Sequence, residues 1–123
     1  MVVGIGVDSI EISRVLHACE KKHFIERIFT QNEQAQFDKS MRRAASDFAG
    51  KEAVVKMLGT GFDGIDADEI AILRAENGAP YVELYGKAKE KADKLGITSV
   101  MISITNTRET ATAFVIGTGE ESM

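Results

Sequence analysis

The residues best suited to chemistry lie four apart, at positions 48, 52 and 56. Phe48, Glu52 and Lys56 share one face of a predicted helix, and Gly59-Thr60-Gly61 follows directly. A carboxylate can bind a hard cation, an ammonium can neutralise phosphate, and glycines let backbone amides approach an anion. A surface ion pair followed by a glycine helix cap explains the same residues more simply. These three side chains alone do not distinguish a binding site from an ion pair with a helix cap, so a second candidate residue elsewhere in the sequence is needed.

Asp8 is the second carboxylate of interest. It follows the apolar run of residues 2–7, which we expect to form a buried strand, with glycines at 4 and 6 where a backbone or a ligand approaches closely. At a strand tip Asp8 would face a cleft, or else cap the next helix, for which Ser9 is also suited. Magnesium usually takes only one or two protein carboxylates and completes its shell with water and substrate phosphate. Asp8 and Glu52 together are such a pair.

Composition limits the class of protein. The 123 residues suffice for one domain, and 44% hydrophobic and 28% charged residues are ordinary for a globular chain. Cys19 has no cysteine partner, and no segment resembles a signal peptide or a membrane span, so we expect a cytoplasmic protein with no membrane partner. The net charge of -4 argues against nucleic acid. A run of basic residues permits an acidic protein partner, although a solvated helix face explains it as well: Arg14, Lys21, Lys22 and Arg27.

Local patterns predict the elements. Thr30 and Glu33 form a capping box for a helix over residues 31–39, and Asn77-Gly78 predicts a hairpin turn with Pro80 at the start of the return strand. The other predictions are a long helix over 41–58, hairpin strands over 70–73 and 81–84, a helix over 86–95 stopped by Gly96, and strands over 98–105 and 110–116. This order predicts one α+β domain over residues 1–117, with a mainly antiparallel sheet packed against the long helix, and a frayed tail over 118–123.

Several motifs together resemble one family. They are Gly-Ile-Gly-Val-Asp at 4–8, Phe-Ala-Gly-Lys-Glu-Ala-Val-Val-Lys at 48–56 and Gly-Thr-Gly at 59–61. In order and spacing they resemble the holo-acyl-carrier-protein synthases, the small trimeric 4′-phosphopantetheinyl transferases. The resemblance extends to Arg14, to Phe29-Thr30, and to residues 76–80 and 103–109. It implies transfer of 4′-phosphopantetheine from coenzyme A to a serine of an apo-acyl carrier protein, with release of 3′,5′-ADP, in fatty acid biosynthesis.

The resemblance also implies roles for particular residues. Asp8 and Glu52 would hold Mg²⁺, Glu52 and Lys56 would be catalytic, and an acidic carrier protein would dock on Arg14. Lys21, Lys22 and Arg27 join that docking surface only by proximity and charge. The family further implies a homotrimer with sites at subunit interfaces. The implied coenzyme A contacts are Phe48, Lys51, Lys56, Gly59, Thr60, Gly61, Gly78, Pro80, Thr105, Asn106 and Thr107.

Two positions depart from the family pattern. Asn106 stands where histidine is more common, and Asp47 stands where arginine is common, so a phosphate contact would be lost or reversed in sign. Lys51, Arg42 or Arg43 would be the replacements. The departures motivate an alternative, a non-catalytic module that binds coenzyme A or a nucleotide. A purely structural or protein-interaction domain is a second alternative, and the intact metal pair with Lys56 favours an enzyme over both.

Overall fold

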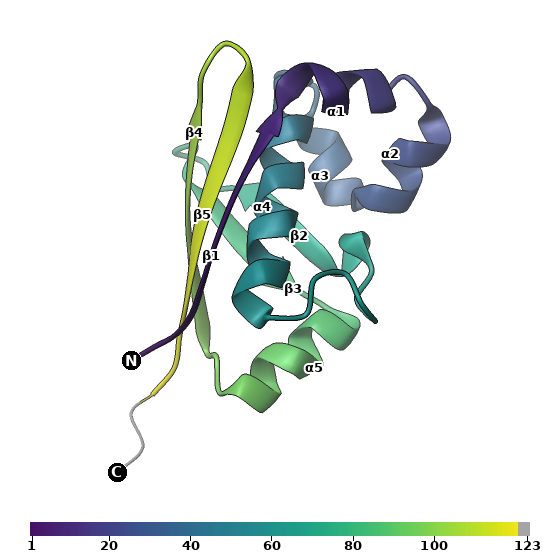
Figure 1. Cartoon of the computed structure of the whole chain (residues 1–123). Helices are drawn as coiled ribbons and strands as arrows, with labels where there is room; N and C mark the ends of the chain where they lie inside the picture. Colours follow the sequence, from purple (N-terminus) through teal and green to yellow (C-terminus); the bar gives the residue numbers. More distant parts are fainter. Residues whose placement is uncertain (121–123) are drawn as a thin grey trace.

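The structure, a computed structural model, describes residues 1–120, and its two antiparallel sheets share one long helix (Figure 1). Strands β1, β5 and β4 form one sheet in that order, and β2 pairs with β3 in the other. In chain order the elements are β1 (Val2–Glu11), α1 (Ile12–Ala18), α2 (Lys22–Ile28), α3 (Gln31–Gln36), α4 (Arg42–Leu58), a 3-10 turn (Ala67–Glu69), β2 (Ile70–Arg74), β3 (Pro80–Leu84), α5 (Gly86–Leu95), β4 (Ser99–Asn106) and β5 (Thr110–Thr118). The predicted α+β class is confirmed, with the strands divided between two sheets.

Helix α4 lies directly on β1, and this close approach explains the glycines of the first strand. A Cβ atom at Gly6 would lie 1.9 Å from the Ala53 carbonyl oxygen, and one at Gly4 would lie 2.6 Å from that of Met57. Real Cβ atoms do not come so near a backbone oxygen. The partner that requires these glycines is therefore the α4 backbone rather than a ligand.

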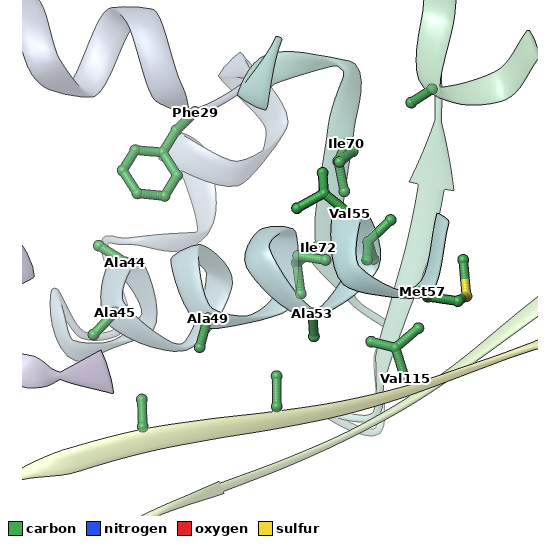
Figure 2. Packing of buried hydrophobic residues seen from close by; sticks show 14 of the residues in the cluster. Phe29, Ala44, Ala45, Ala49, Ala53, Val55, Met57, Ile70, Ile72 and Val115 are labelled. Carbon is green, nitrogen blue, oxygen red and sulfur yellow. The ribbon is translucent and has the colours of Figure 1, made fainter. Parts of the chain in front are cut away.

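The core is built around α4, against which buried residues of the three-stranded sheet, of β2 and of the other helices pack. Figure 2 shows Ala45, Ala49 and Ala53 of α4 on the side of the sheet, with Val115 of β5 opposite. Small side chains let a helix pack closely against a strand. Met41 precedes α4 and is exposed. The α4 residues with no exposed surface are Ala44, Ala45, Ala49, Ala53 and Val54.

Several local predictions are confirmed. The Thr30 hydroxyl accepts from the Glu33 amide at 3.1 Å, and the Glu33 carboxylate accepts from the Thr30 amide at 2.9 Å, which completes the capping box. Gly78 adopts φ 88° in the hairpin turn, and β3 begins at Pro80. Gly96 adopts φ 78° and ends α5.

Other boundaries differ from the predictions. Strand β1 continues to Glu11, so Ser9 lies within the strand and does not cap a helix. Its hydroxyl shares a hydrogen bond with the hydroxyl of Thr112 on the neighbouring strand β5. Helix α3 ends at Gln36 rather than at residue 39. Thr118 belongs to β5 rather than to the expected tail, whose residues 121–123 lie outside the described residues. Among the described helices, none has the length and apolar character needed to cross a membrane.

Candidate active site

Asp8 and Lys56 meet where β1 crosses α4. Nζ of Lys56 donates to Oδ1 of Asp8 at 3.0 Å and to the carbonyl oxygen of Val7 at 3.1 Å. Asp8 lies within β1 and not at its tip, and it does not cap α1. Because side chains alternate along a strand, Asp8 faces α4 on the same side as Gly6. Helix and strand thus bring together residues 48 positions apart in the sequence.

Glu52 completes this group of charges. Partial burial raises the pKa of Glu52, the neighbouring carboxylate of Asp8 raises it further, and Lys56 lowers it. Glu52 and Lys56 both lie in α4 and are four residues apart, so they share one face of the helix, as predicted. Two adjacent carboxylates repel each other, so a cation between them is favourable.

The donor set at Asp8 and Glu52 fits a hard divalent cation. Both side chains offer carboxylate oxygens, which Mg²⁺ prefers, and their mutual repulsion favours positive charge nearby. Within residues 1–120 no group of three or more His, Cys, Asp or Glu side chains is arranged to hold a metal. Water and substrate oxygens would therefore have to supply the remaining ligands.

A pocket of about 490 Å³ adjoins Glu52, and we call it the Glu52 pocket. Phe48, one turn before Glu52, forms part of its wall and stacks on Phe24 with ring centroids 6.3 Å apart. The Glu52 pocket therefore combines apolar and acidic side chains and lies next to Asp8, Glu52 and Lys56. The Glu52 pocket is lined by Arg27, Ile28, Phe48, Glu52, Phe62, Ile65, Asp66, Ala67 and Asp68.

The segment Gly59-Thr60-Gly61 ends α4. Gly59 adopts φ 79°, and the amides of both Gly59 and Thr60 donate to the carbonyl of Val55. These two amides close the helix end, so they do not point at an anion as the sequence suggested. Gly61 adopts φ 59°, so backbone conformation alone accounts for glycine there.

Lys51 requires a correction, because its ammonium is buried in the core. Its Nζ donates to Oε1 of Glu33 at 2.7 Å, to the carbonyl of Ala67 at 2.9 Å, and to the carbonyl of Ile70. Both side chains of the Lys51–Glu33 pair have 0% exposure. Lys51 lies one residue before Glu52, on another face of α4. It cannot reach coenzyme A from this position.

Asp47 likewise points into the protein. Its Oδ1 accepts from Nη1 of Arg74 at 2.8 Å, and its side chain has 0% exposure. Burial raises the pKa of Asp47 to about 7, and the charge of Arg74 opposes this rise. The carboxylate is thus a buried partner of Arg74 and presents no negative charge to a bound phosphate.

The remaining coenzyme candidates gather at the other end of α4. A pocket of about 350 Å³ lies there, and we call it the arginine pocket. Asn106 reaches it from the end of β4 and donates from Nδ2 to the Ser46 hydroxyl at 2.8 Å. The arginine pocket and the Glu52 pocket share no residue. The arginine pocket is lined by Ser40, Arg42, Arg43, Ser46, Arg74, Gly78, Pro80, Ile104 and Asn106.

Thr105 and Thr107 have structural roles near this pocket. Thr105 pairs with Thr112 across the sheet. The Thr107 hydroxyl accepts from the amide of Thr110 at 3.0 Å and thus shapes the β4–β5 turn. Arg42 anchors that turn to α4 by donating to the Thr107 carbonyl at 2.8 Å.

The basic residues proposed for carrier docking occupy two helices. Arg14 lies on α1, whereas Lys21 precedes α2 and Lys22 begins it, and all three are exposed. Arg27 alone also lines the Glu52 pocket. The structure therefore brings Arg27 near the charged group, with the other three on the adjoining surface.

Sequence reasoning missed Arg74 and Ser46 as members of the arginine pocket. Arg74 is the last residue of the apolar strand β2, and Ser46 lies in α4 next to Asp47 in the sequence. Each looks like an ordinary surface residue in the sequence. Only the packing of β2 and β4 against α4 reveals them, because their partners Asp47 and Asn106 lie 27 and 60 positions away.

Comparisons with known proteins identify the family to which this chain belongs. The family model of the 4′-phosphopantetheinyl transferase superfamily matches residues 4–115. This chain therefore belongs to that superfamily of transferases. A holo-[acyl-carrier-protein] synthase of Lachnoclostridium phytofermentans is 51% identical over 117 residues, which cover 95% of this chain and 96% of the relative.

Solved structures agree with the fold. The Plasmodium yoelii acyl carrier protein synthase with ADP bound has a TM-score of 0.88 at 28% identity, covering 98% of both chains. The Helicobacter pylori holo-[acyl-carrier-protein] synthase in complex with coenzyme A has a TM-score of 0.80 at 30% identity, covering 93% of this chain and 99% of that one. Within the superfamily, the chain is an enzyme of the holo-[acyl-carrier-protein] synthase family, which transfers phosphopantetheine from coenzyme A to an apo-acyl carrier protein.

Proposed function

We propose that Asp8, Glu52 and Lys56 form the centre at which this protein transfers 4′-phosphopantetheine from coenzyme A to a carrier-protein serine. The observation that carries the proposal is the meeting of two carboxylates and an ammonium beside the Glu52 pocket. In the reaction the serine oxygen bonds to the β-phosphorus, the pyrophosphate bond breaks, and 3′,5′-ADP leaves. Such chemistry depends on positioning the groups and on neutralising negative charge.

Asp8 and Glu52 are the proposed Mg²⁺ ligands. When bound there, Mg²⁺ would neutralise pyrophosphate oxygens and make the phosphorus more electrophilic. Lys56 is half-exposed, so its ammonium can turn from Asp8 to a leaving phosphate oxygen. Glu52 lines the pocket through which a serine side chain can enter, and its carboxylate is the proposed acceptor of the serine proton.

The structure weakens the alternative that this protein is a non-catalytic module that binds coenzyme A or a nucleotide. That alternative depended partly on Asp47 repelling a phosphate, but Asp47 is buried against Arg74. Asn106 can still donate a hydrogen bond to an anion, because its amide has two N–H groups and Ser46 takes one. Neither departure from the family pattern thus argues against turnover.

A homotrimer with sites between subunits accounts for two further observations. The helices lie on one side of the three-stranded sheet, and its other face is apolar and uncovered (Figure 1). The exposed apolar side chains of that face are Ile5 (60%), Val7 (51%), Met101 (54%) and Phe114 (41%). Such a face favours burial against another copy of the chain. The Glu52 and arginine pockets are also separate within one chain, and association is a way to join them.

The carrier protein and the cell compartment complete the proposal. Arg14, Lys21, Lys22 and Arg27 would attract an acidic carrier protein, mainly by raising the association rate. The reaction would take place in the cytoplasm and supply carrier protein for fatty acid biosynthesis. Coenzyme A would be the co-substrate.

The direct test of activity is the intact mass of an apo-acyl carrier protein after incubation with this protein, coenzyme A and Mg²⁺. A gain of one phosphopantetheine group, prevented by EDTA and by Asp8→Ala or Glu52→Ala in folded protein, is the expected result. Normal turnover by either variant at low Mg²⁺ would refute the metal assignment.

Mixing two inactive variants tests the shared site. Glu52→Ala removes the charged centre, and Asn106→Trp fills the arginine pocket. If each site uses one pocket from each of two subunits, co-expression restores about a quarter of wild-type activity, because random assembly leaves that share of interfaces intact. Mixed trimers without any recovery would show that each chain holds a complete site.

A further inference from the structure

Lys56 is the counter-ion of Asp8 in this structure. Its ammonium donates to Oδ1 of Asp8 at 3.0 Å and to the carbonyl oxygen of Val7 at 3.1 Å. Within residues 1–120, no other lysine or arginine side chain forms an ion pair with Asp8. The proposed metal ligand Asp8 therefore already has a positive charge beside it, and that charge belongs to the protein.

The same ammonium also acts on Glu52. Glu52 lies four residues before Lys56 on one face of α4, and the charge of Lys56 opposes the repulsion that Asp8 exerts on the Glu52 carboxylate. Lys56 thus neutralises part of the negative charge that makes these two carboxylates attractive to a cation. Because two positive charges near one carboxylate repel each other, Mg²⁺ at this pair has either to displace the ammonium or to bind against its repulsion.

Lys56 can leave Asp8 at little cost. The side chain of Lys56 is 53% exposed and that of Asp8 is 16% exposed. Ion pairs that are open to water contribute little to stability, and the lysine ammonium is carried by a flexible chain of four carbons. A phosphate group near the site would offer this ammonium several charged oxygens in place of one carboxylate. The contact with Asp8 is therefore one that Lys56 can exchange for a contact with a phosphate.

The ligand that draws Lys56 away follows from the proposed function, on which this inference rests. The proposed reaction brings the pyrophosphate of coenzyme A to Asp8, Glu52 and Lys56. We propose that Lys56 competes with Mg²⁺ for Asp8 in the free protein, and that the coenzyme pyrophosphate ends this competition by binding the ammonium. Coenzyme A and Mg²⁺ then bind cooperatively, and each strengthens the binding of the other by the same factor.

The first test measures Mn²⁺ binding to the protein without coenzyme A, by electron paramagnetic resonance of the free ion. Mn²⁺ replaces Mg²⁺ as the probe because both prefer carboxylate oxygens. Lys56→Met removes the charge but keeps the length of the side chain. It should tighten Mn²⁺ binding by about twofold to tenfold, because a partly exposed ion pair and the repulsion of the ammonium are both removed. Lys56→Arg keeps the charge and should stay within about twofold of the wild-type affinity.

Lys89→Met is the matched control. Lys89 forms a partly exposed ion pair with Asp93 on α5, so this variant loses the same charge and a similar contact elsewhere in the molecule. Its affinity for Mn²⁺ should equal that of the wild-type protein. If Lys56→Met binds Mn²⁺ no more tightly than Lys89→Met, with both variants folded by circular dichroism, Lys56 does not compete for the cation and the inference is wrong.

The second test repeats the Mn²⁺ titrations with saturating coenzyme A and without carrier protein, after correction for the Mn²⁺ that coenzyme A binds in solution. Coenzyme A should strengthen Mn²⁺ binding to the wild-type protein. The factor should be smaller for Lys56→Met, because Asp8 is free of the ammonium before the coenzyme binds. Equal factors for the two proteins would overturn the exchange of partners by Lys56.

The outcomes separate this inference from the proposed function. Carrier-protein modification that EDTA prevents, together with unchanged Mn²⁺ binding in Lys56→Met, would overturn the inference alone. A folded wild-type protein that binds no Mn²⁺ even with coenzyme A, and modifies the carrier protein equally well in EDTA, would overturn the proposed metal site as well.

Discussion

Replacing Lys51 by methionine should destabilise the protein strongly while leaving the catalytic parameters of the folded enzyme unchanged. The ammonium of Lys51 lies 2.7 Å from the Glu33 carboxylate in the core, and both side chains are fully buried. Methionine keeps the length and apolar character of the chain but removes the charge. Glu33 would then be a buried carboxylate without its cation.

The magnitude follows from the contacts that are lost. Besides Glu33, the carbonyls of Ala67 and Ile70 lose their donor, while Glu33 keeps the amides of Thr30 and Ile72. Removing one partner of a buried ion pair costs about 3–5 kcal/mol. Since a domain of this size unfolds with about 5–15 kcal/mol, the variant should lose a large share of its stability.

Urea unfolding followed by circular dichroism measures this loss. Lys89→Met is the matched control, because Lys89 also pairs with a carboxylate, Asp93, but on the exposed face of α5. The control should lose less than about 0.5 kcal/mol. Adding Glu33→Gln to Lys51→Met should recover part of the loss, since the unpaired charge is then gone while an acceptor remains.

Two results would contradict this reasoning. A loss no larger than that of the Lys89 control would mean that the buried pair contributes little to folding. An increased KM for coenzyme A at normal stability would instead place Lys51 in the coenzyme site, as the sequence alone suggested.

Three further predictions concern the strand, the buried acid and the docking surface. Gly6→Ala should destabilise the protein by about 1–3 kcal/mol in urea unfolding, because the added Cβ would overlap the Ala53 carbonyl oxygen. A loss under about 0.5 kcal/mol would contradict this close contact. For Asp47 the folded pKa of about 7 exceeds the unfolded value of 3.8, so its contribution to stability falls as pH rises between these values. Relative to Asp47→Asn, the wild-type protein should lose about 2–3 kcal/mol from pH 5 to pH 8, and parallel profiles would exclude this titration. Arg14→Glu should raise the KM for carrier protein in a salt-dependent way, and an effect confined to coenzyme A would rule out docking there.

Much of the site was predictable because helical periodicity is a local property. The four-residue spacing put Glu52 and Lys56 on one face of α4, and the structure brings Asp8 to them. Asp8 was expected at a strand tip, but β1 continues past it. The strand reaches Glu11 because β5 offers pairing partners as far as Thr110, and the sequence of β1 does not contain that information.

Three local features follow from the sequence alone: the Thr30–Glu33 capping box, the Asn77-Gly78 turn, and the glycine that stops α5. Such features depend on neighbours within a few positions, so the chain specifies them locally. The burial of Lys51 and Asp47, by contrast, depends on contacts that form only when the chain folds. Their counter-charges Glu33 and Arg74 lie 18 and 27 positions away, and a charge can be buried only where folding brings its partner to it.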